Sequence, residues 1–266
     1  MELYENCVGL INVDSPGCRG AKEVGFSTSG IVSDSLKKMV LDHTEQSEVV
    51  VKPLGRGSDL SFYGVQIPIQ ISFDYYQEGE NRGRWHCAGC GGGWWWHTAE
   101  DNYDKIDYEY LIRDTEIIWD MIEYLRNTKE LPFDCMQCME GIENLIEEID
   151  KNSDEAFDFT PIKSKAALLK QKAAHMKIFK NDVFAKKIGG RLSMLLCSAC
   201  DEYHYDNTFS VGQLPGLQMV KGYYRDQMDE RDFLFLQTAF IRQRNRTVAE
   251  LKKIIEIWEE ENERIF

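Results

Sequence analysis

The chain has 266 residues, of which 43% are hydrophobic, and its 45 acidic and 31 basic side chains give a formal net charge of −14. No apolar run approaches the roughly 18 residues that a membrane-spanning helix needs, so the composition excludes membrane insertion. An acidic chain also repels nucleic acids, except where basic residues gather. The length suits either one large domain or two small ones.

The first 73 residues have the pattern of β-strands with a single helix among them. Short apolar runs and alternating segments predict strands over 7–13, 49–51 and 60–73. Pro68 favours an edge position for the last of these, because proline has no N–H to donate to a neighbouring strand. Ser33 or Asp34 is placed to cap a helix that runs to Val40.

The segment from Trp85 to His97 contains the first of three Cys-x-x-Cys pairs, Cys87-Ala-Gly-Cys90, followed by three glycines. Two thiolates at this spacing bind one metal ion together, and residues without Cβ allow the backbone amides to turn towards the sulfur atoms. We therefore expect a zinc knuckle here, in which His86 or His97 can replace a thiolate.

Three consecutive tryptophans, 94–96, follow the glycines. In a strand the first and third share one face, so at least one indole lies near the surface, where it could stack on a base, a sugar or a partner side chain. We favour the simpler interpretation, in which the indoles pack around the knuckle and shield its sulfur atoms.

From Tyr103 onward the apolar residues recur at helical spacing. The expected buried face of the first helix consists of Ile106, Tyr110, Ile117 and Met121, widened by Leu111, Ile118, Ile122 and Leu125. Further helices are expected over 139–149 and 163–187, and two more after Asp226. The last should begin at the capping-box sequence from Thr247 to Glu250.

The fold class that follows is α+β. We expect a β-rich N-terminal part with zinc knuckles in residues 1–102, and a mainly helical part with the second and third cysteine pairs in residues 103–266. Whether the two parts form separate domains or a single one is left open, because no low-complexity linker marks a boundary.

The second and third pairs are Cys135-Met-Gln-Cys138 and Cys197-Ser-Ala-Cys200. Eight cysteines produce only about 0.2 pairs at this separation by chance, so three pairs indicate a metal site. Separated pairs are typical of zinc ribbons, in which two pairs hold one Zn²⁺ with four thiolates. We expect one or two zinc ions, with the sharing of pairs left open, bound by Cys87, Cys90, Cys135, Cys138, Cys197 and Cys200.

Other uses of the cysteines remain open. Cys7 and Cys18 would complete a second four-thiolate set with the third pair, or they are buried thiols. Cys135 and Cys138 suit a redox pair at a helix start, and four thiolates also suit an iron–sulfur cluster. Residues 1–6 have no basic or long apolar region of a secretory signal, so we expect a cytoplasmic location rather than structural disulfides.

Charge is unevenly distributed along the helical part. Residues 100–158 hold 19 acidic and 5 basic side chains, whereas residues 159–191 hold 1 acidic and 9 basic ones. The basic stretch could contact the phosphates of a nucleic acid, but we favour ion pairs within the protein or with a protein partner. Its lysines are Lys163, Lys165, Lys170, Lys172, Lys177, Lys180, Lys186 and Lys187.

These observations predict a zinc-stabilised interaction or regulatory protein that binds another macromolecule, a protein rather than a nucleic acid. The alternative is a zinc-dependent hydrolase or deaminase, in which Glu100 acts as a base beside a metal-activated water held with His97. Zinc deaminases, however, have His-x-Glu where this chain has one residue more, and they have a proline where Asp134 precedes Cys135. We therefore assign no catalytic residue.

Overall fold

The computed structural model describes residues 2–29, 34–54, 62–76, 95–96, 98–128, 135–174, 182–201, 203–204, 206 and 212–263. The chain divides into two units, each built from separate stretches of sequence. We call them the helical unit, which comprises Met1–Val8, Arg56–Pro68 and Asp134–Phe266, and the sheet unit, which comprises Gly9–Gly55 and Ile69–Phe133. Within the described residues there is one four-stranded sheet and there are eight α-helices, so the α+β class and the helical C-terminal part are confirmed.

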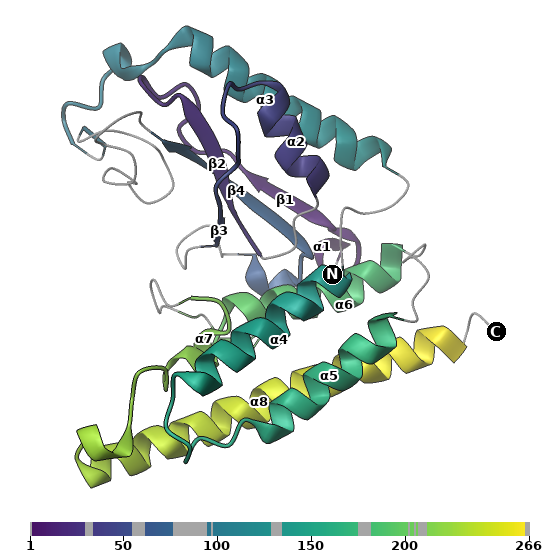
Figure 1. Cartoon of the computed structure of the whole chain (residues 1–266). Coiled ribbons are helices and arrows are strands. Elements are labelled where there is room, and N and C mark those ends of the chain that lie inside the picture. Colours follow the sequence, from purple (N-terminus) through teal and green to yellow (C-terminus); the bar gives the residue numbers. More distant parts are fainter. Residues whose placement is uncertain are drawn as a thin grey trace. The chain divides into compact units, whose positions relative to one another are not determined.

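The sheet has the strand order β1-β4-β2-β3 (Figure 1). Its strands are β1 (Gly9–Asn12), β2 (Glu23–Thr28), β3 (Val51–Pro53) and β4 (Ile69–Tyr76). Strand β1 is parallel to β4, β2 is antiparallel to β4, and β3 is parallel to β2. Strand β4 is therefore central rather than at an edge. Pro68 is tolerated because it stands just before the first residue of the strand, where no ladder hydrogen bond needs its nitrogen.

One face of the sheet is covered by α2 (Asp34–Asp42) and α3 (Tyr108–Asn127) (Figure 1). The helix expected up to Val40 is thus confirmed as α2. Asp107 caps the start of helix α3, because its carboxylate accepts hydrogen bonds from two backbone amides of the first turn. The core between these layers contains Val24, Phe26, Leu36, Val40, Ile69, Ile71, Phe73, Tyr75, Ile117 and Met121.

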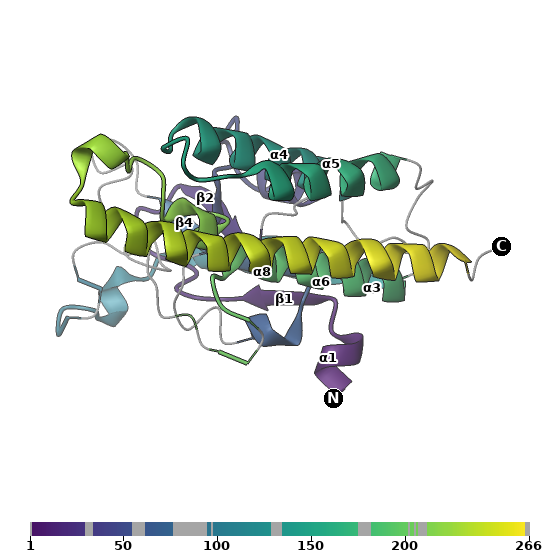
Figure 2. The ribbon, with the colours of Figure 1, turned by 90° about the horizontal axis from the view of Figure 1, so that it is seen from below.

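The helical unit contains α1 (Glu2–Asn6), α4 (Cys135–Lys151), α5 (Thr160–Ala174), α6 (Asp182–Cys197), α7 (Pro215–Gln218) and α8 (Glu230–Glu263). Helix α5 packs against both α4 and α8, and α6 and α7 also pack against α8, which runs the length of the unit (Figure 2). Phe157 joins these layers, with ring centroids 5.2 Å from Phe233 and 5.3 Å from Phe240.

Helix α8 corrects one prediction. A helix start was expected at Thr247, but this residue lies in the middle of α8, which begins at Glu230. The hydroxyl of Thr247 is buried and donates to the carbonyl of Gln243, one turn earlier, at 2.9 Å. A threonine in this arrangement satisfies itself within a continuous helix, so the capping-box pattern is not used here.

Helix α6 lies very close to the turn that carries Gln66. Lys186 is buried and its ammonium group donates to the carbonyls of Val65 at 2.8 Å and Gln66 at 2.5 Å. One turn later, Gly190 has no side chain where the Gln66 carbonyl approaches. Gln66 itself has a φ of 55°, in the left-handed region that few residues other than glycine adopt. No helix in the described part of the chain is long and apolar enough to cross a membrane.

Candidate metal centre and neighbouring pocket

The predicted zinc ligands occupy different parts of the structure. Cys87, Cys90 and His97 lie outside the described residues, so the first knuckle is not seen. Cys135 is the first residue of α4, and Cys138 is buried one turn later. In the part of the chain that the structure describes, no group of three or more His, Cys, Asp or Glu side chains is arranged to hold a metal ion. The zinc knuckles that we expected are therefore not shown.

The third pair is the best described of the three. Cys197 is the last residue of α6 and is buried, whereas Cys200 is partly exposed in the turn that follows. The amide of Ala199 donates to the carboxylate of Asp206 at 2.8 Å, and the amide of Cys200 donates to the hydroxyl of Ser198 at 2.9 Å. The turn between the two cysteines is thus held in one conformation from the N–H side.

Side chains of α8 hold the carbonyl side of the same turn. The guanidinium of Arg246 donates to the carbonyls of Ser198 at 2.7 Å and Cys200 at 3.0 Å, and Gln243 donates to the carbonyl of Ala199 at 3.1 Å. Three successive carbonyls are therefore satisfied by two residues one turn apart. A preorganised turn of this kind fixes the separation of two ligands before a metal arrives.

Arg246 also places positive charge beside the pair. Burial lowers the pKa of its guanidinium, while the negative groups nearby, among them Glu250 and Asp206, work in the opposite direction. A cation next to a thiol favours the thiolate, which is the form that binds metals and attacks electrophiles. The turn therefore suits either two metal-binding thiolates or a reactive thiol at Cys200.

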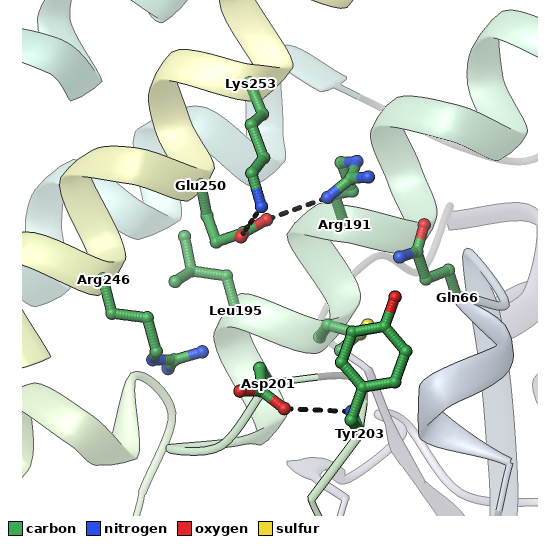
Figure 3. Close-up of a pocket in the computed structure, with 9 residues that line it drawn as sticks. Gln66, Arg191, Leu195, Asp201, Tyr203, Arg246, Glu250 and Lys253 are labelled. Atoms are coloured by element: carbon green, nitrogen blue, oxygen red, sulfur yellow. Dashed lines mark hydrogen bonds and ion pairs between the residues drawn. The ribbon is translucent and has the colours of Figure 1, made fainter.

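Next to this turn lies a cavity of about 220 Å³ (Figure 3). The carboxylate of Glu250 accepts from Arg191 at 3.0 Å and from Lys253 at 2.7 Å, and the amide of Tyr203 donates to Asp201 at 2.9 Å. Described residues that line the cavity are Gln66, Arg191, Met194, Leu195, Asp201, Tyr203, Arg246, Glu250 and Lys253. None of them is a serine, cysteine or histidine, so this lining offers no nucleophile–base pair of the hydrolase type.

A second cavity, of about 510 Å³, lies in the sheet unit beside Trp95 and Trp96. Both indoles are partly buried, and Trp95 packs against the core of that unit. The ammonium of Lys105 lies 5.8 Å from the centre of the Trp95 ring, within range of a cation–π interaction. Cys18 also lines this cavity. Two half-exposed indoles could accept a flat or apolar group from a partner.

The basic stretch is largely paired inside the helical unit. Lys163 lies 2.8 Å from Glu147 and 2.6 Å from Asp150, both on α4. Lys170 lies 2.7 Å from Glu143 on α4, and Lys172 lies 2.7 Å from Glu259 on α8. Lys186 donates hydrogen bonds to two carbonyls, as described above, and Arg191 forms an ion pair with Glu250. Lys177 and Lys180 lie outside the described residues.

The sheet carries a polar face that the sequence analysis missed. The hydroxyl of Ser27 donates to Asp74 at 2.7 Å, and the amide of Asn12 donates to the hydroxyl of Ser72 at 3.1 Å. Ser72 and Asp74 are buried. Burial and the nearby Asp74 raise the pKa of Tyr76 above its ordinary value. The alternation of apolar and polar residues along 69–76 was the available signal.

Comparison with models of known protein families and with curated protein sequences gives no match to this chain.

Proposed function

We propose that this chain is an interaction protein that binds another protein, and that zinc held by its cysteine pairs stabilises it. The preference for a protein partner rests on one observation: most of the described basic side chains of residues 159–191 are already paired within the protein. Of its seven described cations, five, Lys163, Lys170, Lys172, Lys186 and Arg191, are engaged by carboxylates or carbonyls of the same unit. Phosphate contacts would have to displace these groups, which weakens the case for a nucleic-acid partner.

Exposed apolar side chains also support a protein partner. The exposed fraction is 61% for Trp119 and 58% for Tyr108, and several other large apolar residues are exposed to a similar degree. Interfaces between proteins obtain much of their affinity from a few such aromatic anchors. An acidic chain with exposed aromatic residues therefore fits a protein ligand better than a polyanion.

The proposal of zinc rests on donor chemistry. Cys197 and Cys200 flank a turn whose backbone groups are hydrogen-bonded by Asp206, Gln243 and Arg246, which suits half of a four-thiolate site. The remaining thiolates would come from a second Cys-x-x-Cys pair, and Cys135 and Cys138 belong to the same unit. Bound zinc would contribute folding free energy and no chemistry. Zinc thiolates need a reducing compartment, so we propose a cytoplasmic location.

Two measurements test this function. Fluorescence polarisation with labelled DNA and RNA at two salt concentrations should show no binding at micromolar affinity in physiological salt. Binding that is lost when Lys170, Lys172 and Lys177 are changed to glutamate would overturn the preference for a protein.

Elemental analysis of freshly reduced protein should find one or two zinc ions per chain, and a metal-free, folded protein would contradict the zinc proposal.

A further inference from the structure

Helix α3 has a second apolar stripe, on the side away from the residues that it buries. Ile117 and Met121 face the core of the sheet unit. Exposed fractions along the stripe are 58% for Tyr108, 60% for Ile112, 61% for Trp119 and 44% for Ile122. Ile122, which we expected to widen the buried face, belongs to this exposed stripe instead. Four large apolar side chains on one exposed helix face are unusual unless something covers them.

The spacing along the stripe is that of a coiled-coil seam. Steps of four, three, four and three residues lead from Tyr108 through Ile112, Thr115 and Trp119 to Ile122. In heptad notation Ile112 and Trp119 occupy a positions, and the other three occupy d positions. A narrow a/d seam accepts one further helix laid along α3, whose 20 residues extend for about 30 Å.

The flank of the seam is acidic. Glu109, Glu116 and Glu123 occupy the e position of three successive heptads. In a coiled coil, side chains at e positions face charged residues of the partner helix. The opposite flank, the g positions, is apolar: Leu111, Ile118 and Leu125. Residues 98–128 as a whole contain nine acidic and three basic side chains, so the surroundings reinforce the negative charge of the flank.

Two neighbouring polar side chains, His43 and Arg126, contact this flank. His43 lies 3.6 Å from Glu116 and 2.7 Å from Asp120, and Arg126 lies 2.8 Å from Glu123. The exposed fractions of the side chains of Glu116, Asp120 and Glu123 are 59%, 49% and 30%, and polar pairs this open to solvent contribute little. A partner's lysine or arginine can replace them without a large loss.

We propose that the exposed face of α3 binds a basic amphipathic helix of another protein, with apolar residues on the seam and Lys or Arg facing Glu109, Glu116 and Glu123. This inference rests on the proposed function and names the surface and the kind of partner. A second copy of the chain fits less well. Two antiparallel α3 helices would place the e-position glutamates opposite one another, and two parallel ones would place them opposite Leu111, Ile118 and Leu125.

The test uses the full chain and two synthetic peptides of three heptads, each with Ile at a and Leu at d. One peptide carries Lys at e and g, and the other carries Glu. We expect the Lys peptide to bind at least about tenfold more tightly, and Trp119→Asp to weaken its binding by at least about tenfold. Phe235→Asp is the matched control, because that side chain is equally exposed but lies on α8.

Charge reversal makes the test specific. Changing Glu109, Glu116 and Glu123 together to lysine should reverse the preference, so that the Glu peptide binds more tightly. Ile112→Asp serves as a second seam variant, and circular dichroism confirms that each variant is folded. Equal binding of the two peptides, or equal losses in Phe235→Asp and Trp119→Asp, would overturn the inference.

Three further outcomes distinguish a failure of this inference from a failure of the proposed function. If sedimentation shows wild-type dimers that Trp119→Asp abolishes, a second copy covers the face and the inference is wrong. If a partner captured from host extract is retained equally by wild type and Trp119→Asp, the chain binds proteins through another surface, so the proposed function stands without this one. If the Lys peptide binds as expected but crosslinking in host extract recovers no protein with wild type or with Trp119→Asp, the proposed function fails.

Discussion

The carbonyl oxygen of Gln66 occupies the space that a β-carbon at Gly190 would need. Backbone atoms cannot move aside as a flexible side chain can, so the contact between α6 and this turn depends on glycine. We expect Gly190→Ala to lower the free energy of unfolding by about 1–3 kcal/mol. Urea denaturation followed by circular dichroism measures the change.

Gly141 provides the matched control. It is exposed in the middle of α4, and a β-carbon there would contact nothing within 4 Å. Gly141→Ala should therefore raise the free energy of unfolding by roughly 0.5–1 kcal/mol, because alanine is the better helix former. Equal effects of the two substitutions would contradict the close approach.

Arg246 should be important for stability because it satisfies two carbonyls of the cysteine turn. Arg246→Met would leave the carbonyls of Ser198 and Cys200 without these donors, which costs about 1–3 kcal/mol. Arg242→Met, an exposed position on the same helix, should change stability by less than about 0.5 kcal/mol. Thermal unfolding of the two variants under the same conditions distinguishes these results.

The lysine at position 186 should give stability a pH dependence. Burial lowers its pKa to about 8, below the value of about 10.4 for an unfolded chain. Between these values the unfolded state binds more protons than the folded state, so the contribution of Lys186 to stability rises as the pH increases from 8 to 10. The free energy of unfolding of wild type should thus increase relative to Lys186→Met over this range, and parallel pH profiles would refute the shift.

Loss of the third cysteine pair should reduce the bound zinc. The double variant Cys197→Ser/Cys200→Ser should contain at least one zinc ion fewer per chain than wild type and should unfold at a lower temperature. Thr238→Ala, an exposed change on α8, serves as the control. Elemental analysis that finds full zinc content in the double variant would remove this pair from the metal site.

Sequence patterns predicted correctly those features that depend on residues close together in the chain. The spacing of Ile117 and Met121 placed them correctly in the core, because helical periodicity and burial agree there. The same pattern failed for Ile122, since two apolar stripes overlap on α3 and sequence does not say which one meets the sheet. Thr247 failed for another reason: a capping-box sequence also occurs inside long helices, where neighbouring turns decide its use.

The surroundings of the third cysteine pair could not be predicted. Cys197 and Cys200 stood out by their spacing alone, but Arg246 binds carbonyls that lie 46 and 48 residues earlier in the chain. No short pattern carries such a relationship. The pairing of Lys163 and Lys170 is similar: the charge distribution predicts ion pairs within the protein, but it does not say that the carboxylates come from α4.

The contact between Lys186 and Gln66 also has a consequence for synthesis of the chain, because the two residues are 120 positions apart. At roughly 5–20 residues per second, the ribosome needs on the order of 6–24 seconds to pass from one to the other. Throughout that interval the Gln66 turn lacks the helix that holds it in the folded protein. A nascent chain in this state is a natural substrate for chaperones, and a truncation before α6 leaves the turn permanently unclosed.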